Sequence, residues 1–131
     1  MLNLQSHLAH FYALAEGGAK DVVHFTISSG LSPTVTVAEQ AAAEVKKKYP
    51  DFNVYAIDSL SATIGQGALV RAALRMRDEG RTAAETAEYV KDMRLHIQYM
   101  VAANDLFYLK RGGRVSSVAA MAGTMLGIKP V

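Results

Sequence analysis

The chain has 131 residues, half of them hydrophobic, and its 14 basic and 12 acidic side chains give a formal net charge of +2. This length and composition predict one globular domain with a substantial core. The basic residues form no long block that would follow a nucleic-acid backbone, and the absence of cysteine excludes disulfides and thiolate metal sites. No apolar run approaches the roughly 20 residues that cross a bilayer, and the first residues lack the pattern of a secretion signal. We therefore expect a cytoplasmic protein without stable membrane insertion.

Helix and strand patterns alternate along most of the chain. Apolar residues at helical spacing predict a helix over 4–16, which two glycines end. The run of β-branched and aromatic residues at 21–28 predicts a buried strand, and 34–49 predicts a helix that Pro50 closes.

The same pattern then repeats. Residues 52–59 predict a second strand, 63–80 a helix, and 83–100 a further helix capped by Thr82 with Glu85 three positions later. Strands that alternate with helices of this length predict an α/β fold in which right-handed βαβ connections build a parallel sheet.

The last part of the sequence has a different character. Residues 104–117 combine an apolar stretch, a basic pair, two glycines and a further arginine, and 118–131 predict a short helix that leads into a strand. Because an unpaired terminal strand would expose its backbone groups, we expect the protein to continue beyond residue 131.

Hydroxyl groups and a glycine follow the first predicted strand, at the edge of a parallel sheet where ligands bind. Ser28 and Ser29 offer hydroxyl donors, Gly30 allows close approach of the backbone, and Ser32 is placed to cap the next helix with Pro33 at its first position. Free N–H groups and the positive end of the helix dipole favour a carboxylate or phosphate here. An ordinary capped turn without a ligand explains the same residues.

The second strand ends in a similar cluster that begins with Asp58. Asp58 is either an ordinary turn cap or part of one crevice with the first loop. An enzyme that uses Ser29 and Asp58, a small α/β hydrolase or a phosphotransferase, is therefore the alternative to a binding site. The GxSxG pattern around a nucleophilic serine is absent.

The histidines do not predict a metal site. His7 and His10 lie one turn apart on the first helix, but no third ligand is near them in sequence, so we expect an exposed helix face. His24 is expected to pack in or beside the sheet, and His96 to lie on a helix surface.

Four motifs, in order along the chain, resemble the DegV family of bacterial fatty-acid-binding proteins, the lipid-carrying subunits of fatty acid kinase. "ISSGLSPT" is similar to the family's "SSxLSGT", and "YAIDSLSATIGQG" to its "DS" strand end followed by a glycine-spaced helix start. "LFYLKRGGR" is similar to "LxYLxxGGRI", and "MLGIKPV" to "LLxIKPI".

The resemblance implies a carrier of a long-chain fatty acid that has no catalytic residue and no cofactor, and that presents its ligand to a separate kinase subunit. Carried over to this sequence, Ser29 with Ser28 beside it would hold the carboxylate, and Gly30 and Ser32 would shape the loop. The tail would be buried in an apolar pocket. Arg114 would meet the kinase or the acyl phosphate.

The sequence departs from the family at several places. Pro33 stands where the family usually has glycine, and the family's N-terminal "TDS" segment, its "TSxPS" loop and its late "HxGP" histidine have no counterpart. The resemblance therefore implies a central piece of the family's fold, with 1–104 in a DegV-like α/β domain and 105–131 beginning a second one. Such a piece could assemble as an oligomer.

Overall fold

The structure is a computed structural model, and it describes residues 3–98 and 106–116. The chain divides into two compact units, Met1–Ile97 and Gln98–Val131. The predicted domain boundary after residue 104 and the helix and strand predicted within 118–131 lie outside the described residues.

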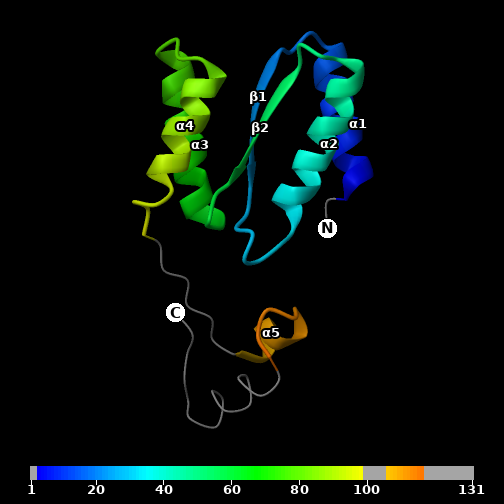
Figure 1. The fold of residues 1–131 in the computed structure, drawn as a ribbon. Helices are drawn as coiled ribbons and strands as arrows, with labels where there is room; N and C mark the ends of the chain where they lie inside the picture. The colour runs from blue at the N-terminus through cyan, green and yellow to red at the C-terminus, as the bar shows by residue number, and fades with distance from the viewer. Residues whose placement is uncertain (1–2, 99–105, 117–131) are drawn as a thin grey trace. The chain divides into compact units, whose positions relative to one another are not determined.

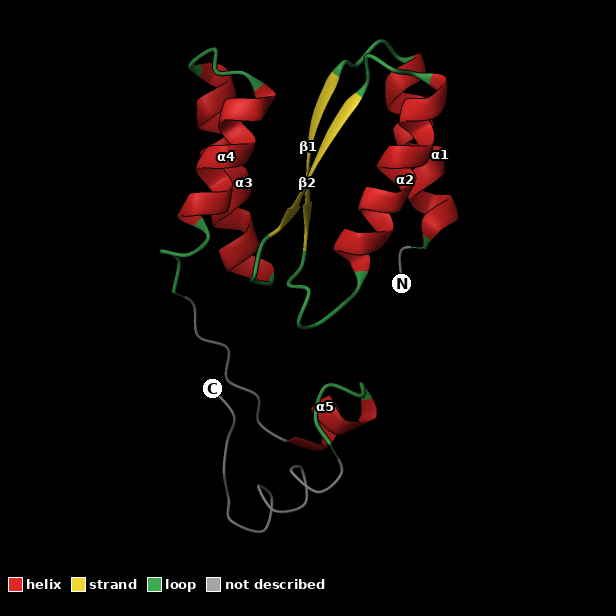
Figure 2. Ribbon diagram, in the orientation of Figure 1, coloured by secondary structure: helices red, strands yellow, loops and turns green. Residues whose placement is uncertain are grey.

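Four helices and two strands build the first unit: α1 (Leu4–Glu16), β1 (Asp21–Thr26), α2 (Thr34–Lys48), β2 (Asn53–Asp58), α3 (Thr63–Asp78) and α4 (Ala83–Met93). The strands pair in parallel, in a register that runs from Asp21 opposite Asn53 to Thr26 opposite Asp58. Helices α1 and α2 lie on one side of this sheet and α3 and α4 on the other (Figures 1 and 2). The predicted α/β fold with a parallel sheet is confirmed.

Two hydrophobic clusters hold the layers together. Between the sheet and the α1–α2 layer the buried residues are Phe11, Ala38, Ala41, Val45 and Phe52. Between the sheet and the α3–α4 layer they are Ile57, Leu69, Ala73, Ala87 and Val90. Because both faces of the strands are covered, the strands read as continuous apolar runs, as the sequence indicated.

The helix boundaries follow from local chemistry. Asn3 caps α1 by accepting a hydrogen bond of 2.9 Å from the backbone N–H of Ser6, and the predicted capping box of Thr82 and Glu85 is present at the start of α4. The prediction of a helix over 83–100 was wrong in its length, because α4 ends at Met93. The N–H of Leu95 there bonds the carbonyl of Asp92, a three-residue turn that replaces the helical pattern.

The second unit is described over 106–116. It contains α5 (Leu106–Arg111), a helix of one and a half turns that the sequence analysis had not predicted, and Gly113 follows it with a φ of 74°. No helix in the described ranges is both long enough and apolar enough to pass through a membrane.

Candidate functional site

The loops that follow β1 and β2 lie side by side at the carboxyl edge of the sheet. The N–H of Ser28 donates to the carbonyl of Ser61 over 2.8 Å, and the N–H of Ser59 donates to the carbonyl of Thr26 over 3.2 Å. These bonds continue the pairing of the strands into the loops. The predicted crevice between the two loops is therefore one hydrogen-bonded surface.

Asp58 ties the two loops together. Its Oδ1 atom accepts hydrogen bonds from the backbone N–H groups of Ser29, at 3.1 Å, and Leu60, at 3.0 Å. Partial burial acts to raise the pKa of Asp58, but hydrogen bonds from the Ser29 hydroxyl and from the backbone of Leu60 and Ser29, with the charge of Arg94, lower the pKa overall. Asp58 is therefore an ionised anchor.

The backbone of the first loop is less available to a ligand than the sequence indicated. Gly30 donates its N–H to the hydroxyl oxygen of Ser28 over 3.2 Å, and the N–H groups of Leu31 and Ser32 bond the carbonyl of Ser28. These three N–H groups are therefore not free, because the loop folds on itself. The hydroxyl hydrogen of Ser28 keeps no acceptor among the described residues, so Ser28 remains a donor at the surface.

The start of α2 also differs from the prediction. Pro33 takes the N-cap position, and Ser32 does not cap the helix but forms a hydrogen bond of 2.6 Å between its hydroxyl and that of Thr34. Ser32 is buried, with 7% of its surface exposed. Because proline has no side-chain acceptor, the N–H groups of the first turn of α2 lack a cap and favour a negative charge nearby.

Exposed apolar residues are neighbours of these hydroxyl residues in sequence. We call them the apolar rim: Ile27, Leu31, Leu60 and Ile64, which are 37%, 39%, 43% and 74% exposed. Ile27 and Leu31 belong to the loop after β1. Leu60 belongs to the loop after β2, and Ile64 to the first turn of α3. Exposed aliphatic residues next to hydroxyl donors suit a ligand with a polar head and an apolar tail.

Two residues that follow β2 lie in the left-handed backbone region, Leu60 in the loop and Thr63 at the first position of α3. Leu60 has a φ of 50° and Thr63 a φ of 47°, values that cost side chains with a Cβ atom about 1 to 2 kcal/mol. Strain of this kind gathers at functional sites.

Replacing Leu60 by glycine is expected to raise the free energy of unfolding by about 0.5 kcal/mol, since relief of the strained φ exceeds the extra chain entropy of glycine. Urea unfolding measures this. Leu95→Gly is the control, because Leu95 is 68% exposed and is not among the residues with positive φ. A loss of stability in Leu60→Gly equal to that of the control would contradict the strain.

Arg94 belongs to this site although the sequence analysis did not single it out. Its Nη1 atom donates to the backbone carbonyl of Asp58 over 2.6 Å, and its Nε atom is buried without a hydrogen-bond partner in the described part of the chain. The only sequence signal was a cation at the C-terminal end of a helix, which is a common position. The contact brings a positive charge under the end of β2.

Arg114, the other arginine of interest, lies in the second unit. It follows Gly113, and its Nη1 atom donates to the carbonyl of Gly112. Its proposed role toward a kinase or a phosphate stays a prediction.

The enzyme alternative would need a histidine next to Ser29 and Asp58 to form a catalytic triad. Ser29 and Asp58 contact each other, as that alternative requires. Over 3–98 and 106–116, however, the hydrogen bonds of these two residues include no histidine. The pair is explained by loop anchoring.

The histidines behave differently from one another. His10 is exposed, as predicted, but the prediction of an exposed face was wrong for His7, which is 2% exposed because its ring packs against Phe11 and His24. The Nδ1 atom of His7 bonds the carbonyl of Asn3, and His24 packs beside the sheet as expected. His96 is exposed just after α4. The described residues contain no group of three side chains that could hold a metal ion.

Comparison with known proteins shows to which family the chain is similar. The family model described as "Uncharacterised protein, DegV family" matches residues 3–131. The DegV domain-containing protein YteA of Lactococcus lactis is 35% identical over 112 residues, which are 86% of this chain and 39% of that protein. Another, CA_C0948 of Clostridium acetobutylicum, is 30% identical over 131 residues, 100% of this chain and 45% of that protein. The chain thus spans less than half the length of these curated relatives.

Solved structures with the same fold have been crystallised with fatty acids. A DegV family protein from Eubacterium eligens, loaded with heptadecanoic acid, superposes with a TM-score of 0.80 at 26% identity, over 97% of this chain and 44% of that one. A stearic acid-binding protein from Eubacterium ventriosum gives a TM-score of 0.78 at 31% identity, over 100% of this chain and 44% of that one.

Proposed function

Because the chain belongs to the DegV family, we propose that it binds a long-chain fatty acid at the carboxyl edge of β1 and β2. The observation that carries this proposal is the apolar rim, whose members are sequence neighbours of hydroxyl residues, next to the loop of Ser28, Ser29 and Ser32, which we call the serine loop. The structural neighbours of the chain include fatty-acid complexes. A fatty acid has the polar head and apolar tail that such a surface suits.

The head of the ligand would meet the first loop. Ser28 donates its uncommitted hydroxyl hydrogen to a carboxylate oxygen, and Ser29 donates its hydroxyl after exchanging Asp58 for the ligand. Gly30 and Ser32 shape the loop through the bonds that fold it. The uncapped first turn of α2 adds the positive end of a helix dipole.

The tail of the ligand would lie on the apolar rim. Each methylene that leaves water contributes about 0.8 kcal/mol, so a tail that covers only part of its length here still gains several kcal/mol. The carboxylate gains little net energy, because it exchanges water for serine hydroxyls. In this division of roles the rim supplies most of the affinity. The serines orient the carboxylate and keep its oxygens paired, so that removal of one hydroxyl leaves an oxygen unpaired and weakens binding.

The protein would act as a carrier and not as a catalyst. It would present the fatty acid to a separate kinase subunit, with Arg114 as the contact to that subunit or to the acyl phosphate, and no cofactor is required. Residues 105–131 would begin a second α/β domain. We also propose that the carrier is cytoplasmic, because it must share a compartment with the kinase to which it presents its ligand.

The test is extraction of the purified, denatured chain with organic solvent, followed by mass spectrometry, and titration of the emptied chain with stearic acid. We expect an acyl chain in the extract, and an affinity reduced about tenfold in Ser28→Ala and in Ser29→Ala. Tyr49→Phe is the control, because it removes a hydroxyl that bonds Glu16 on the α1–α2 layer. An empty extract with no stearic acid binding, or equal affinities in all variants, would contradict the proposal.

A further inference from the structure

Arg94 lies at the carboxyl edge of the sheet, on the side of α3 and α4. Helix α3 leads away from this edge and α4 returns toward it, so the residue that follows α4 lies near the end of β2 (Figure 1). The N–H of Arg94 bonds the carbonyl of Val90 over 3.0 Å, which continues the helical pattern and fixes the backbone. Its Nη1 atom donates to the carbonyl of Asp58 over 2.6 Å. The end of one helix thus holds a cation at the end of a strand.

The positive charge of Arg94 is not cancelled by an ion pair. The side chain is partly buried, and its Nε atom is buried without a hydrogen-bond partner in the described part of the chain. The ion pairs found over 3–98 and 106–116 do not include Arg94. The bond to the carbonyl of Asp58 leaves the charge in place, because that acceptor is neutral. Since a partly buried charge is screened less than an exposed one, it acts on the carboxylate of Asp58.

The proposed ligand would bring a second negative charge to this place. A fatty acid carboxylate that takes over the hydroxyl of Ser29 lies next to Asp58, the ionised anchor that releases this hydroxyl. Two carboxylates that share a site repel each other, so the second binds in its ionised form only if a cation is near. Among the described residues of the first unit, Arg94 is the cation that acts on Asp58. Its position meets this requirement.

We propose that Arg94 is a positioning residue that makes the serine loop selective for lipids with an anionic head group over lipids with the same tail and a neutral head. This inference rests on the proposed function. Arg94 acts through Asp58, because its charge offsets that of the carboxylate and leaves the site without a net negative charge. The uncapped first turn of α2 then favours an ionised head group. A fatty alcohol gains none of this attraction.

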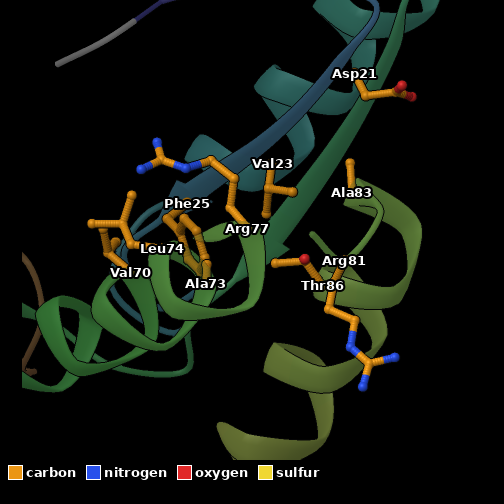
Figure 3. Close-up of a pocket in the computed structure, with 10 residues that line it drawn as sticks. All are labelled: Asp21, Val23, Phe25, Val70, Ala73, Leu74, Arg77, Arg81, Ala83 and Thr86. Atoms are coloured by element: carbon orange, nitrogen blue, oxygen red, sulfur yellow. The ribbon is translucent and has the colours of Figure 1, made fainter. Parts of the chain in front are cut away.

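Other arginines of the same helical layer lie at the opposite edge of the sheet. Figure 3 shows a groove beside β1 that is lined by Arg77 and Arg81 together with Asp21, the first residue of β1. Helix α3 begins at Thr63, next to the site, so Arg77 in its last turn lies about 20 Å farther along the helix axis. Removing the charge of Arg77 therefore provides a matched control for removing that of Arg94.

A purely structural role of Arg94 predicts a different result. Its hydrogen bond to the carbonyl of Asp58 stabilises the end of β2 whatever the ligand is, so loss of this bond alone would weaken both kinds of lipid equally. Loss of the charge weakens mainly the lipid that carries a charge. The ratio of the two dissociation constants separates these roles.

The test measures the Kd of the full chain for stearic acid and for 1-octadecanol. Both are delivered from cyclodextrin, whose competition cancels when variants are compared. In Arg94→Gln we expect the ratio of the Kd for stearic acid to the Kd for 1-octadecanol to rise about tenfold, because the head group loses the attraction of a unit charge. Arg94→Lys keeps the charge and should hold the ratio within about threefold of the native value. Arg77→Gln should hold it within about twofold, because its charge is distant and exposed.

Asp58→Asn tests the same pair of charges from the other side. It removes the negative charge while Arg94 keeps its own, so the ratio is expected to fall about threefold. This variant also decides the question if Arg94→Gln does not fold, which circular dichroism and urea unfolding reveal.

The outcomes distinguish this inference from the proposed function. A native chain that does not bind stearic acid overturns both. If the native chain binds both lipids, an unchanged ratio in Arg94→Gln, or in Asp58→Asn where Arg94→Gln is unfolded, overturns the inference alone. An equal rise of the ratio in Arg94→Lys and Arg94→Gln also overturns it, because that result would assign the effect to the geometry of the hydrogen bond and not to the charge.

Discussion

Replacing Asp58 by alanine is expected to lower the free energy of unfolding by about 2 kcal/mol and to weaken stearic acid binding about tenfold. The carboxylate accepts the N–H groups of Ser29 and Leu60, one from each part of the site, and hydrogen bonds to a charged group contribute about 1.5 to 3 kcal/mol. Without this anchor the serine loop is no longer held next to the loop of β2. Urea unfolding and titration with stearic acid measure the two effects.

Asp58→Asn separates the anchor from the charge. Its amide oxygen still accepts the same two N–H groups, so we expect about half of the stability loss of Asp58→Ala. Removing the negative charge beside the serine loop is expected to tighten stearic acid binding about threefold, because the ligand is an anion and Arg94 keeps its charge. Equal weakening of binding in both variants would show that the charge itself is needed and would contradict this division.

Acidification from pH 7 to pH 4 is expected to lower the free energy of unfolding by about 2 kcal/mol through His24 alone. Burial, with the nearby His7 and His10 side chains, lowers the pKa of His24 from 6.5 to about 4. The folded state therefore binds fewer protons than the unfolded state in this window, and stability falls as the pH decreases below 6.5. The full shift corresponds to more than 3 kcal/mol, which we reduce because the ring is partly exposed to solvent.

His24→Phe is expected to remove most of this pH dependence while keeping the edge-to-face ring contact with Phe11, whose centroid is 5.2 Å away. His96→Gln is the control, since His96 is exposed, and should leave the profile unchanged. Asp58 adds a separate loss only below its ordinary value of 3.8, because its pKa is lowered and its stabilisation disappears on protonation. A flat profile between pH 6.5 and 4 in the native chain would contradict the role of His24.

The order of elements could be predicted because it depends on local patterns. The first helix was predicted over 4–16 and is observed at Leu4–Glu16, and both strands and the helices after them were placed within two residues at each end. Spacing of apolar residues, glycine stops and the capping box of Thr82 act within a few residues. The family match over 3–131 confirms the resemblance seen in four motifs.

The site could be predicted only in part, because its geometry depends on contacts distant in sequence. That Ser28, Ser29 and Asp58 would share one edge followed from the parallel sheet. That Asp58 would occupy the N–H of Ser29, and that Arg94 would reach the carbonyl of Asp58 across 36 positions, followed from no local pattern. The burial of His7 was missed for the same reason, since it depends on His24 from a different element.

The division of the core into two clusters has a consequence for how this sequence can vary. The buried residues of one cluster lie between the sheet and α1–α2, and those of the other between the sheet and α3–α4, so no buried residue belongs to both. Substitutions in different clusters should therefore change the free energy additively. Residues of one cluster can therefore change without altering the packing of the other. The loops after β1 and β2 are the exception, because they connect the sheet to α2 in one layer and to α3 in the other and are hydrogen-bonded to each other.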